Sequence, residues 1–429
     1  MDHDVIVVGT RAAGAATAML LARAGLRVLA VDRARFPSDT LSTHQVQVPG
    51  IARLRRWGVL DRIAGVTPAV PTVRLDAGRA VLHGRYPVVD GVGELYGPRR
   101  TVLDAALVEA AREAGVEVRE GFAVEKLTRD AEGRTTGIRG RERGEGRGRG
   151  PSARRITATA PLVIGADGKR STIAEAVGAK AYHVRQPATF ACYTYWSGVD
   201  LPVGEIHTRP GLTVPAFPTN DGLVMVALFA PLADFDRFRA DPAASYQAAL
   251  DRCGGDLGDR VRSGVRAEPF RLAPDVPNGF RVPHGPGWAL VGDAGVVMDP
   301  VAGQGISNAF RDAELLAAAI VRGLAPGGRL DDELAGYQRD RDATALPIYS
   351  MTRSLAALRV SVGQRLLLAA IADDPAETTR FLGVLAGSER YDDYLRAGNV
   401  LGRLGAGVGR RLLCKGPAAD QADAAPVAG

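Results

Sequence analysis

Short apolar runs alternate with amphipathic stretches in the first part of the chain. Residues 4–9 and 27–32 are apolar and each run ends at a turn or a polar residue, which is typical of buried strands. The alanine- and leucine-rich segment 12–24 between them predicts a helix, and Gly25 predicts its end. Strand, helix and strand in this order predict a βαβ unit. A further amphipathic helix is expected over 101–114, followed by the strand "VEVRE".

The hydrophobic period changes in the middle of the chain. Apolar strands are expected at residues 162–168 and 287–295, and the second precedes a glycine-rich loop and a helix over 307–321. Residues 188–231 instead alternate, with many aromatic and β-branched side chains, which is typical of an antiparallel sheet. Residues 73–86 predict a hairpin of the same kind. The pattern therefore predicts one α/β domain that two sheet-rich insertions interrupt.

Composition restricts the class of protein. A chain of 429 residues with 46% hydrophobic and 24% charged residues is globular and too long for one ordinary core. No apolar run long enough for a membrane span is present, and the first strand begins too early for a signal peptide. Cys192, Cys253 and Cys414 lie too far apart for a disulfide framework or a metal set. We therefore expect no metal and a cytoplasmic location.

Charge adds little. The net charge of +6 is small for this length, and the one dense basic run is "RERGEGRGRG" at residues 141–150. Glycine and glutamate interrupt that run, and it contains no aromatic residue. We expect a solvated hairpin tip there and no nucleic-acid partner.

The first βαβ unit carries most of a dinucleotide-binding fingerprint. Gly9 is placed to make the tight turn, Gly14 to let helix and strand pack, and Asp32 to bind ribose hydroxyls, 18 residues after Gly14. Arg11 stands where the middle glycine is usual. An arginine is tolerated there if its φ is negative, and its guanidinium could lie near a pyrophosphate that meets the helix N-terminus. The alternative is a plain βαβ turn with a surface arginine.

Three further segments indicate which nucleotide is bound. "GPRRTVLDAAL" places Arg100 just ahead of a helix, and "VIGADGKRS" places Asp167 at a strand end. "LVGDAGVVMDPVAGQGISNAFRDAELLA" carries Asp293 and a glycine loop ahead of a helix. With the first βαβ unit and segment 39–61, these motifs resemble the para-hydroxybenzoate hydroxylase and geranylgeranyl reductase group of flavoproteins, the group A flavoprotein monooxygenase superfamily. The resemblance covers residues 4–60, 96–180 and 284–320, and arginine at position 11 is a known variant within that group.

The resemblance implies the fold and its domains. The expected class is α/β, with a Rossmann-like FAD-binding domain interrupted by an antiparallel β-sheet substrate domain and followed by a C-terminal helical region. The expected boundaries are 1–72, 98–182 and 278–330 for the FAD-binding domain, 73–97 and 183–277 for the substrate domain, 331–415 for the helical region, and 416–429 for a disordered tail.

The resemblance also implies contacts with FAD. Gly9 and Gly14 would cradle the pyrophosphate, and Asp32 would bind the adenosine ribose. Asp293 would hold the ribityl hydroxyls, although a turn or N-cap role is the alternative, and Asp167 could equally serve the fold. The positive end of the helix that begins near Gly303 would face the isoalloxazine and stabilise reduced flavin. The other expected contacts are Arg100 at the pyrophosphate or ribityl chain, Val124 at the adenine through its backbone, and Arg11, Ala12, Ala13, Arg33, Gly292, Pro300, Gln304, Gly305 and Ile306.

Three residues are candidates for catalysis or substrate recognition. His44 follows the flavin-side loop "LST" and could relay a proton or position substrate, titrating between about pH 6 and 8. Its alternative is a loop histidine that bonds backbone. Tyr193 and Tyr195 share one strand face, while Cys192 and Trp196 share the other, so the tyrosines either recognise substrate or merely pack. Further pocket or core candidates are Phe217, Met225 and Phe229.

Four activities fit a flavoprotein of this kind. We favour a monooxygenase that hydroxylates an electron-rich aromatic or natural-product small molecule through a flavin hydroperoxide, with dioxygen as co-substrate. The alternatives are reduction or dehydrogenation of a carbon–carbon bond, halogenation, and a non-catalytic flavin carrier. Halogenation is disfavoured because relatives with that activity carry a lysine in the first hundred residues, whereas this chain has none before Lys126, and because their GWxWxIP motif is absent. No second nucleotide-binding unit is present, so we expect NAD(P)H as a transient co-substrate or a separate flavin reductase.

Overall fold

The structure is a computed structural model that describes residues 2–142, 154–274 and 276–414. From residue 143 on, the expected hairpin tip at 141–150 lies outside the described residues, and so does the expected disordered tail at 416–429.

A parallel sheet forms the first layer of the fold. Within the described residues it has six strands in the order β20-β21-β11-β1-β2-β7, and only β20 runs antiparallel to its neighbour. Every residue of β1, β2, β11 and β21 is buried, as expected where helices or further strands cover both faces. The strands are β1 Val5–Val8, β2 Val28–Asp32, β7 Glu117–Glu120, β11 Leu162–Gly165, β20 His284–Gly285 and β21 Trp288–Leu290.

Different elements cover the two faces of this sheet. Val5 and Val7 of β1 pack toward the helices α1, α4 and α9, while Ile6 and Val8 pack toward an antiparallel sheet of β8, β9 and β10 and the short helix α5. This alternation follows from the period of two along a strand. The covering elements are α1 Ala12–Arg23, α4 Arg100–Glu113, α9 Gly305–Leu324, α5 Thr172–Ala176, β8 Phe122–Arg129, β9 Thr135–Glu142 and β10 Arg154–Thr159.

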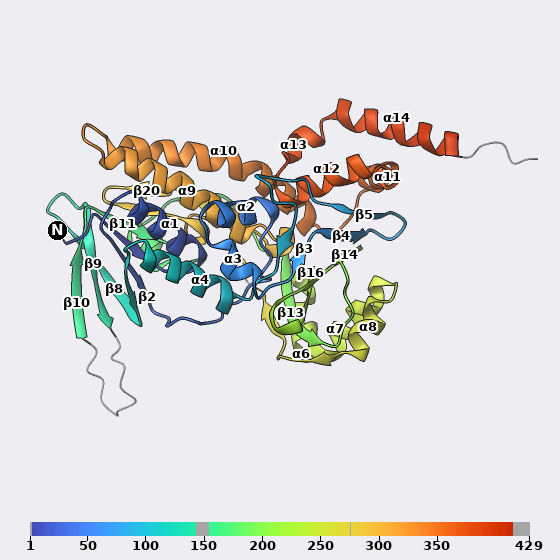
Figure 1. The fold of residues 1–429 in the computed structure, drawn as a ribbon, viewed down its shortest axis with the longest axis horizontal. Coiled ribbons are helices and arrows are strands. Elements are labelled where there is room, and N and C mark those ends of the chain that lie inside the picture. Colours follow the sequence, from blue (N-terminus) through green and yellow to red (C-terminus); the bar gives the residue numbers. More distant parts are fainter. Residues whose placement is uncertain (1, 143–153, 275, 415–429) are drawn as a thin grey trace, which may run out of the picture.

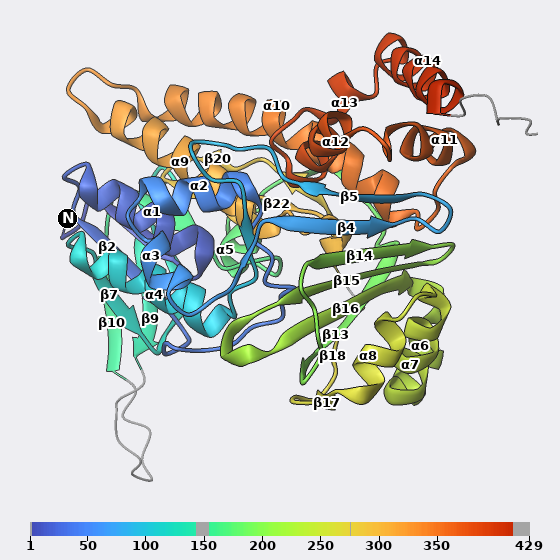
Figure 2. The ribbon, with the colours of Figure 1, turned by 45° about the vertical axis from the view of Figure 1, so that its right-hand side comes forward.

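A second, larger sheet lies beside the first layer (Figure 2). Its strands follow the order β17-β13-β16-β15-β14-β4-β5, with β18 also paired to β13, and β14 pairs with β4 in parallel. The hairpin and the alternating region predicted from the sequence thus join one sheet. The strands are β4 Thr72–Asp76, β5 Val81–Arg85, β13 Thr189–Ser197, β14 Gly204–Arg209, β15 Leu212–Pro218, β16 Val224–Pro231, β17 Val265–Arg266 and β18 Arg271–Ala273.

Three helices cover the outer face of the larger sheet. They are α6 Phe235–Ala240, α7 Pro242–Cys253 and α8 Leu257–Ser263, which follow the alternating residues 188–231 within the expected β-sheet substrate domain. Tyr246 and Leu250 of α7 pack against Phe190 and Cys192 of β13. The helices form because the outer sheet face is apolar and needs a cover, which the strand alternation alone did not reveal.

The C-terminal part is helical, as the sequence indicated. The long helix α10 packs along α9, and α11 to α14 lie above the larger sheet near β4 and β5 (Figures 1 and 2). Capping fixes where these helices begin: Ser361 and Gln364 form a capping box at α11, and Asp374 caps α12 ahead of Pro375. The helices are α10 Leu330–Ala356, α11 Val362–Ile371, α12 Pro375–Ala386, α13 Tyr391–Tyr394 and α14 Ala397–Cys414.

Smaller elements connect these layers. The remaining strands form two small sheets, β12-β19-β22 and β3-β6. The elements are α2 Val48–Arg56, α3 Leu60–Ala64, β3 Ala69–Val70, β6 Leu95–Tyr96, β12 Ala181–Arg185, β19 Asn278–Arg281 and β22 Val296–Val297.

Candidate functional site

The turn between β1 and α1 requires its glycines. Gly9 has φ +96°, and a Cβ there would lie 2.5 Å from the carbonyl oxygen of Ala166. A Cβ on Gly14 would overlap the carbonyl oxygen of Gly9. The helix α1 has neither a side-chain cap nor an acidic residue in its first turn. Its first backbone N–H groups, which include those of Ala12 and Ala13, are therefore suited to an anion such as a pyrophosphate.

Arg11 occupies this turn without strain, because its φ is −79°. Its guanidinium does not point into the turn. It donates to the Asp104 carboxylate at 2.8 Å, to the Ser38 hydroxyl at 2.9 Å and to the Asp39 carbonyl at 3.0 Å. These bonds tie α1 to α4 and to residues 38–39, and the expected contact between this guanidinium and the pyrophosphate stays a prediction.

Asp104 was missed by the sequence analysis. Its side chain is fully buried and accepts hydrogen bonds from Arg11 and from Arg100, the latter at 2.8 and 3.1 Å. The spacing of Arg100 and Asp104, four residues apart on a predicted helix, was the available signal. Because one carboxylate holds two guanidinium groups, Asp104 fixes the positions of both cations beside the nucleotide turn.

Asp32 and its neighbours lie at the end of β2. The Asp32 carboxylate is 8% exposed and accepts from the Thr10 N–H at 2.8 Å and from the Ala34 N–H at 2.8 Å. These bonds hold the carboxylate beside the nucleotide turn. Arg33 is exposed, and Val124 lies in β8 next to a bulge, so their contacts with the adenosine part stay predictions.

Asp293 lies in the turn that follows β21. Its residue is solvent-exposed, and none of the hydrogen bonds found among the described residues involves it. Desolvation raises the pKa of Asp293, and the nearby positive charges of Arg100 and Lys169 oppose this rise. Gly292, with φ +60°, brings this loop against Ala13, whose Cβ would lie 2.7 Å from a Cβ on Gly292.

The start of α9 forms another wall of the same region. Gly303 has φ +61°, and a Cβ on Gly305 would meet no atom within 4 Å. The α9 N-terminus has no side-chain cap and no acidic residue in its first turn, so its N–H groups can face a ligand. The Gln304 amide donates to the Leu385 carbonyl of α12 at 2.6 Å, which ties the start of α9 to the C-terminal helices. Ile306 is buried, at 7% exposed.

Asp167 has a structural role at the start of α5, and its expected contact with the cofactor stays a prediction. Its carboxylate accepts from the Thr172 N–H at 2.7 Å, the Thr172 hydroxyl at 2.9 Å and the Ile173 N–H at 3.2 Å, and the Ser171 hydroxyl also donates to it. These bonds satisfy the first N–H groups of α5. The sequence could not distinguish this role, because a strand-end aspartate suits both a ligand and a following helix.

His44 does not meet the expectation that it titrates near neutrality. It is 1% exposed, and burial together with the positive charges of Arg100 and Arg99 lowers its pKa to about 3. Its Nε2 lies in hydrogen-bond contact with the Tyr195 hydroxyl, and its Nδ1 is buried without a partner among the described residues. The physical reason is desolvation, which disfavours the imidazolium. His44 is therefore a neutral, fixed side chain.

The two tyrosines pack behind the same loop. The Tyr193 hydroxyl accepts from the Ser42 N–H at 3.2 Å, and the Arg99 guanidinium lies 4.6 Å from the Tyr195 ring centre. Tyr193 is 3% exposed and Tyr195 is fully buried. Both tyrosines share a core with α1 and α9, whereas Cys192 on the other strand face packs against α7. The expected separation of faces is present, and Tyr193 supports the loop through its bond to Ser42.

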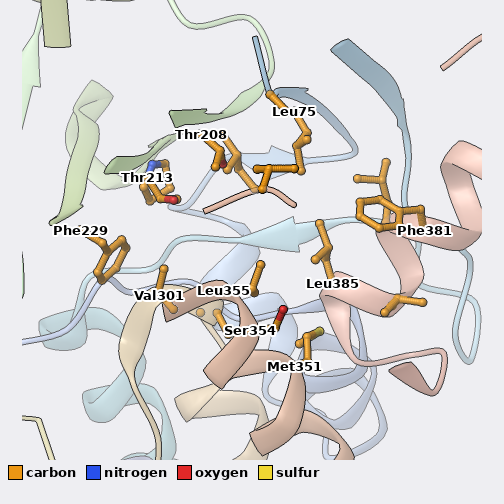
Figure 3. Close-up of a pocket in the computed structure, with 18 of the residues that line it drawn as sticks. Leu75, Thr208, Thr213, Phe229, Val301, Met351, Ser354, Leu355, Phe381 and Leu385 are labelled. Atoms are coloured by element: carbon orange, nitrogen blue, oxygen red, sulfur yellow. The ribbon is translucent and has the colours of Figure 1, made fainter. Parts of the chain in front are cut away.

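A large cavity adjoins the loop before α9 (Figure 3). It has a volume of about 1460 Å³, including the open space at its mouth. Three groups of residues surround it. The larger sheet contributes Leu75, Ile206, Thr208, Thr213, Pro215, Met225 and Phe229; the loops contribute Thr43, Gln45, Gln47 and residues 300–303, which include Pro300; the C-terminal helices contribute Met351, Ser354, Leu355, Phe381, Leu382 and Leu385.

The composition of this wall defines what the cavity can hold. Figure 3 shows Thr208, Phe229, Leu355 and Leu385 pointing toward one space from separate elements. Most of the wall is aliphatic or aromatic, with a few hydroxyl and amide groups, which is typical of a small-molecule site. Met225 and Phe229 were expected as pocket or core residues, and they line this cavity, whereas Phe217 is buried in the core. The helical part of the wall was not anticipated from the sequence.

These features define a class of protein. A parallel sheet with a glycine turn, a helix N-terminus suited to an anion and a carboxylate that is unpaired among the described residues fits a dinucleotide. Residues 2–205 match the model of the family described as the FAD-binding domain. The chain is an FAD-dependent oxidoreductase.

Relatives and solved structures agree with this class. The chain is 28% identical to menaquinone reductase of Mycolicibacterium smegmatis over 75% of this chain and 76% of that protein. It is 26% identical to a rifampicin monooxygenase of Streptomyces venezuelae over 82% of this chain and 70% of that protein. The flavin-dependent brominase Bmp2 has the same fold, with a TM-score of 0.78 over 95% of this chain and 99% of that chain at 17% identity.

Two kinds of feature, a membrane-spanning helix and a metal-binding cluster, are absent from the described residues. No helix in this part of the chain is long and apolar enough to cross a membrane. No group of three or more His, Cys, Asp or Glu side chains in the described ranges is arranged to hold a metal ion.

Proposed function

We propose that the protein is an FAD-dependent monooxygenase that hydroxylates an apolar, electron-rich small molecule bound in the cavity beside α9. In this reaction one oxygen atom of dioxygen enters the substrate and the other leaves as water. NAD(P)H, used directly or through a separate flavin reductase, supplies the two electrons. A natural-product substrate and a cytoplasmic location belong to the same proposal.

The observation that carries the proposal is the position of the apolar cavity. Its wall includes Gly303, at the start of α9, and Gln47, whose amide lies 3.5 Å from the Gly303 carbonyl oxygen. When bound, FAD supplies the oxygen chemistry, which requires that water be kept from the reacting centre. Met351, Leu355 and Leu385 supply that exclusion, because they close the cavity on the side opposite the sheet.

The protein's own residues have binding and orienting roles in this proposal. The first turn of α1 binds the pyrophosphate, Asp32 the adenosine ribose, and Asp293 the ribityl hydroxyls. The N-terminus of α9 stabilises negative charge on reduced flavin through its N–H groups. His44 is neutral at physiological pH because burial lowers its pKa, so it does not act as an imidazolium.

Reduction of a carbon–carbon double bond is the second candidate. It is favoured by the similarity to menaquinone reductase, whose name describes a reaction on an apolar quinone, and an apolar cavity would suit such a substrate equally well. Halogenation has less support. The fold is shared with a brominase, but the lysine expected of a halogenase within the first hundred residues is absent. The first lysine of the chain is Lys126, on β8.

The decisive experiment follows the fate of dioxygen. Purified protein saturated with FAD is supplied with NAD(P)H, or with a flavin reductase, and with a panel of apolar aromatic and polyketide-like compounds. Incubation under ¹⁸O₂ should give a product with one labelled oxygen. Turnover that continues without dioxygen would instead establish the reductase, and a product that requires halide would establish the halogenase.

A pair of variants tests whether the cavity is the substrate site. Leu355→Trp places a large ring in the cavity, and Leu366→Trp makes the same change on an exposed position of α11 outside the wall. Leu355→Trp should abolish substrate-dependent turnover while FAD occupancy stays full, and Leu366→Trp should retain both. Normal turnover by Leu355→Trp would place the substrate elsewhere.

A further inference from the structure

One residue of the cavity wall differs from all the others. Arg359 is the single charged side chain among the described residues that line the cavity. It lies in the connection between α10 and α11 and is exposed, so its guanidinium is at the mouth. No ion pair or hydrogen bond within the described part of the chain involves it. An apolar cavity with one free cation at its entrance is suited to a ligand with one anionic end.

The backbone next to Arg359 is anchored to the larger sheet. Leu358, the residue before Arg359, has φ +49° and is 2% exposed, a conformation that costs a non-glycine residue free energy. The Leu358 side chain packs with Phe229 and Ala191, its N–H donates to the Leu355 carbonyl at 2.9 Å, and its carbonyl accepts from the Gly211 N–H at 2.8 Å. Such a conformation persists only where its surroundings determine it, so the α10–α11 connection is anchored to the sheet.

Nearby carboxylates do not compete for Arg359. The cavity wall contains no acidic residue in the described ranges. Glu377 is the carboxylate that approaches the wall, through the Tyr394 hydroxyl at 3.4 Å, but it is paired with Arg403 and with Arg380. The guanidinium of Arg359 therefore has its full donor capacity available for a ligand.

We propose that Arg359 binds a carboxylate or phosphate group at one end of an elongated, otherwise apolar substrate. This inference rests on the proposed function, because it assigns the substrate of the same cavity. The anionic end lies at the mouth, and the apolar part extends inward toward Val301 and Gly303, where the flavin would act. Arg359 is thus a specificity-determining residue: it sets which end enters and selects against neutral compounds of the same shape.

The test measures binding and requires no turnover. The probes are a pyrene-labelled fatty carboxylate, its methyl ester and the corresponding alkyl phosphate, titrated into FAD-saturated protein and followed by fluorescence. Wild-type protein should bind an anionic probe about fivefold more tightly than the ester, as one partly exposed charge contact allows. The carboxylate and phosphate arms identify which anion is preferred.

Variants then locate the preference. Arg359→Gln should reduce anion binding to the level of the ester, and Arg359→Lys should restore part of the difference. Arg365→Gln is the matched control, because Arg365 is exposed on α11, has no partner among the described residues and lies outside the cavity wall. Leu355→Trp should weaken binding of all three probes.

The outcomes separate the two proposals. A wild-type protein without a preference for the anions, or a preference that survives Arg359→Gln, would overturn the role of Arg359. Binding that Leu355→Trp leaves unchanged would also overturn it, since the probes would then occupy another surface. These results leave the monooxygenase proposal open to its own test, because labelled dioxygen reports the reaction whichever end of the substrate is recognised.

Discussion

The buried carboxylate of Asp104 offers the sharpest test of how the nucleotide turn is held. We predict that Asp104→Asn lowers the free energy of unfolding by about 3 kcal/mol. The side chain is fully buried and accepts one bond from Arg11 and two from Arg100, so removing its charge leaves two cations without their shared partner. Breaking a buried ion pair costs about 3–5 kcal/mol, and the 25% exposure of the Arg11 side chain places this case at the lower end.

The assay is equilibrium unfolding in urea, followed by circular dichroism and by flavin fluorescence. Glu113→Gln is the matched control, because Glu113 lies on the same helix and pairs with Arg62 at 2.6 Å but is 53% exposed. That change should cost about 0.5 kcal/mol. If the two variants differ by less than about 1 kcal/mol, the reasoning that burial makes the Asp104 pairs strong is refuted.

Other predictions follow from the same site. The purified protein should be yellow and release FAD, identified by mass; release of FMN would contradict the roles of Gly9, Gly14 and Asp32. Asp293→Ala should weaken FAD binding tenfold or more, from the loss of one charge-assisted bond of about 1.5–3 kcal/mol, with little change in the unfolding midpoint; full flavin occupancy would give Asp293 a local structural role only. Arg11→Gly should destabilise the protein by about 1–2 kcal/mol while FAD binding falls less than fivefold, because the guanidinium binds Asp104 and residues 38–39; a hundredfold loss of FAD affinity would restore the pyrophosphate contact. His44 should contribute no inflection to activity between pH 6 and 8. The pKa of His44 is about 3 in the folded state and about 6.5 in the unfolded state, so between pH 6.5 and pH 3 only the unfolded state binds this proton. His44 therefore lowers the free energy of unfolding as pH falls from 6.5 toward 3, by up to about 1.4 kcal/mol per pH unit. His44→Gln should remove this contribution in urea titrations at several pH values.

The parallel sheet and its glycine turn could be predicted from the sequence because they depend on local patterns. Continuous apolar runs give buried strands, and the tight turn between β1 and α1 requires Gly9 and Gly14. The helices over 235–263 could not be predicted in the same way, because the alternating pattern of a strand does not indicate which element covers its outer face.

The candidate site was harder to predict where a residue has two possible partners. Asp167 suits a ligand or a following helix, and only the distances to Thr172 and Ile173 show that it bonds to the helix. His44 follows a loop that suggested chemistry, but its protonation depends on burial and on Arg99 and Arg100, which are distant in sequence. Arg359 lies in a connection without a motif, and its position at the cavity depends on how the C-terminal helices pack over the larger sheet, which the sequence pattern does not indicate.

The parallel sheet has a consequence for how the chain is synthesised and handled. Its strands come from residues as distant as Val5 and Leu290, and β21 pairs with β11 across more than a hundred intervening residues. During translation the sheet cannot be completed until residue 290 has left the ribosome, so β11 lacks its neighbour β21 while the intervening residues are synthesised. The nucleotide-binding part therefore cannot be expressed as one contiguous fragment, and a truncation after residue 205 would expose an open edge at β11 that invites aggregation.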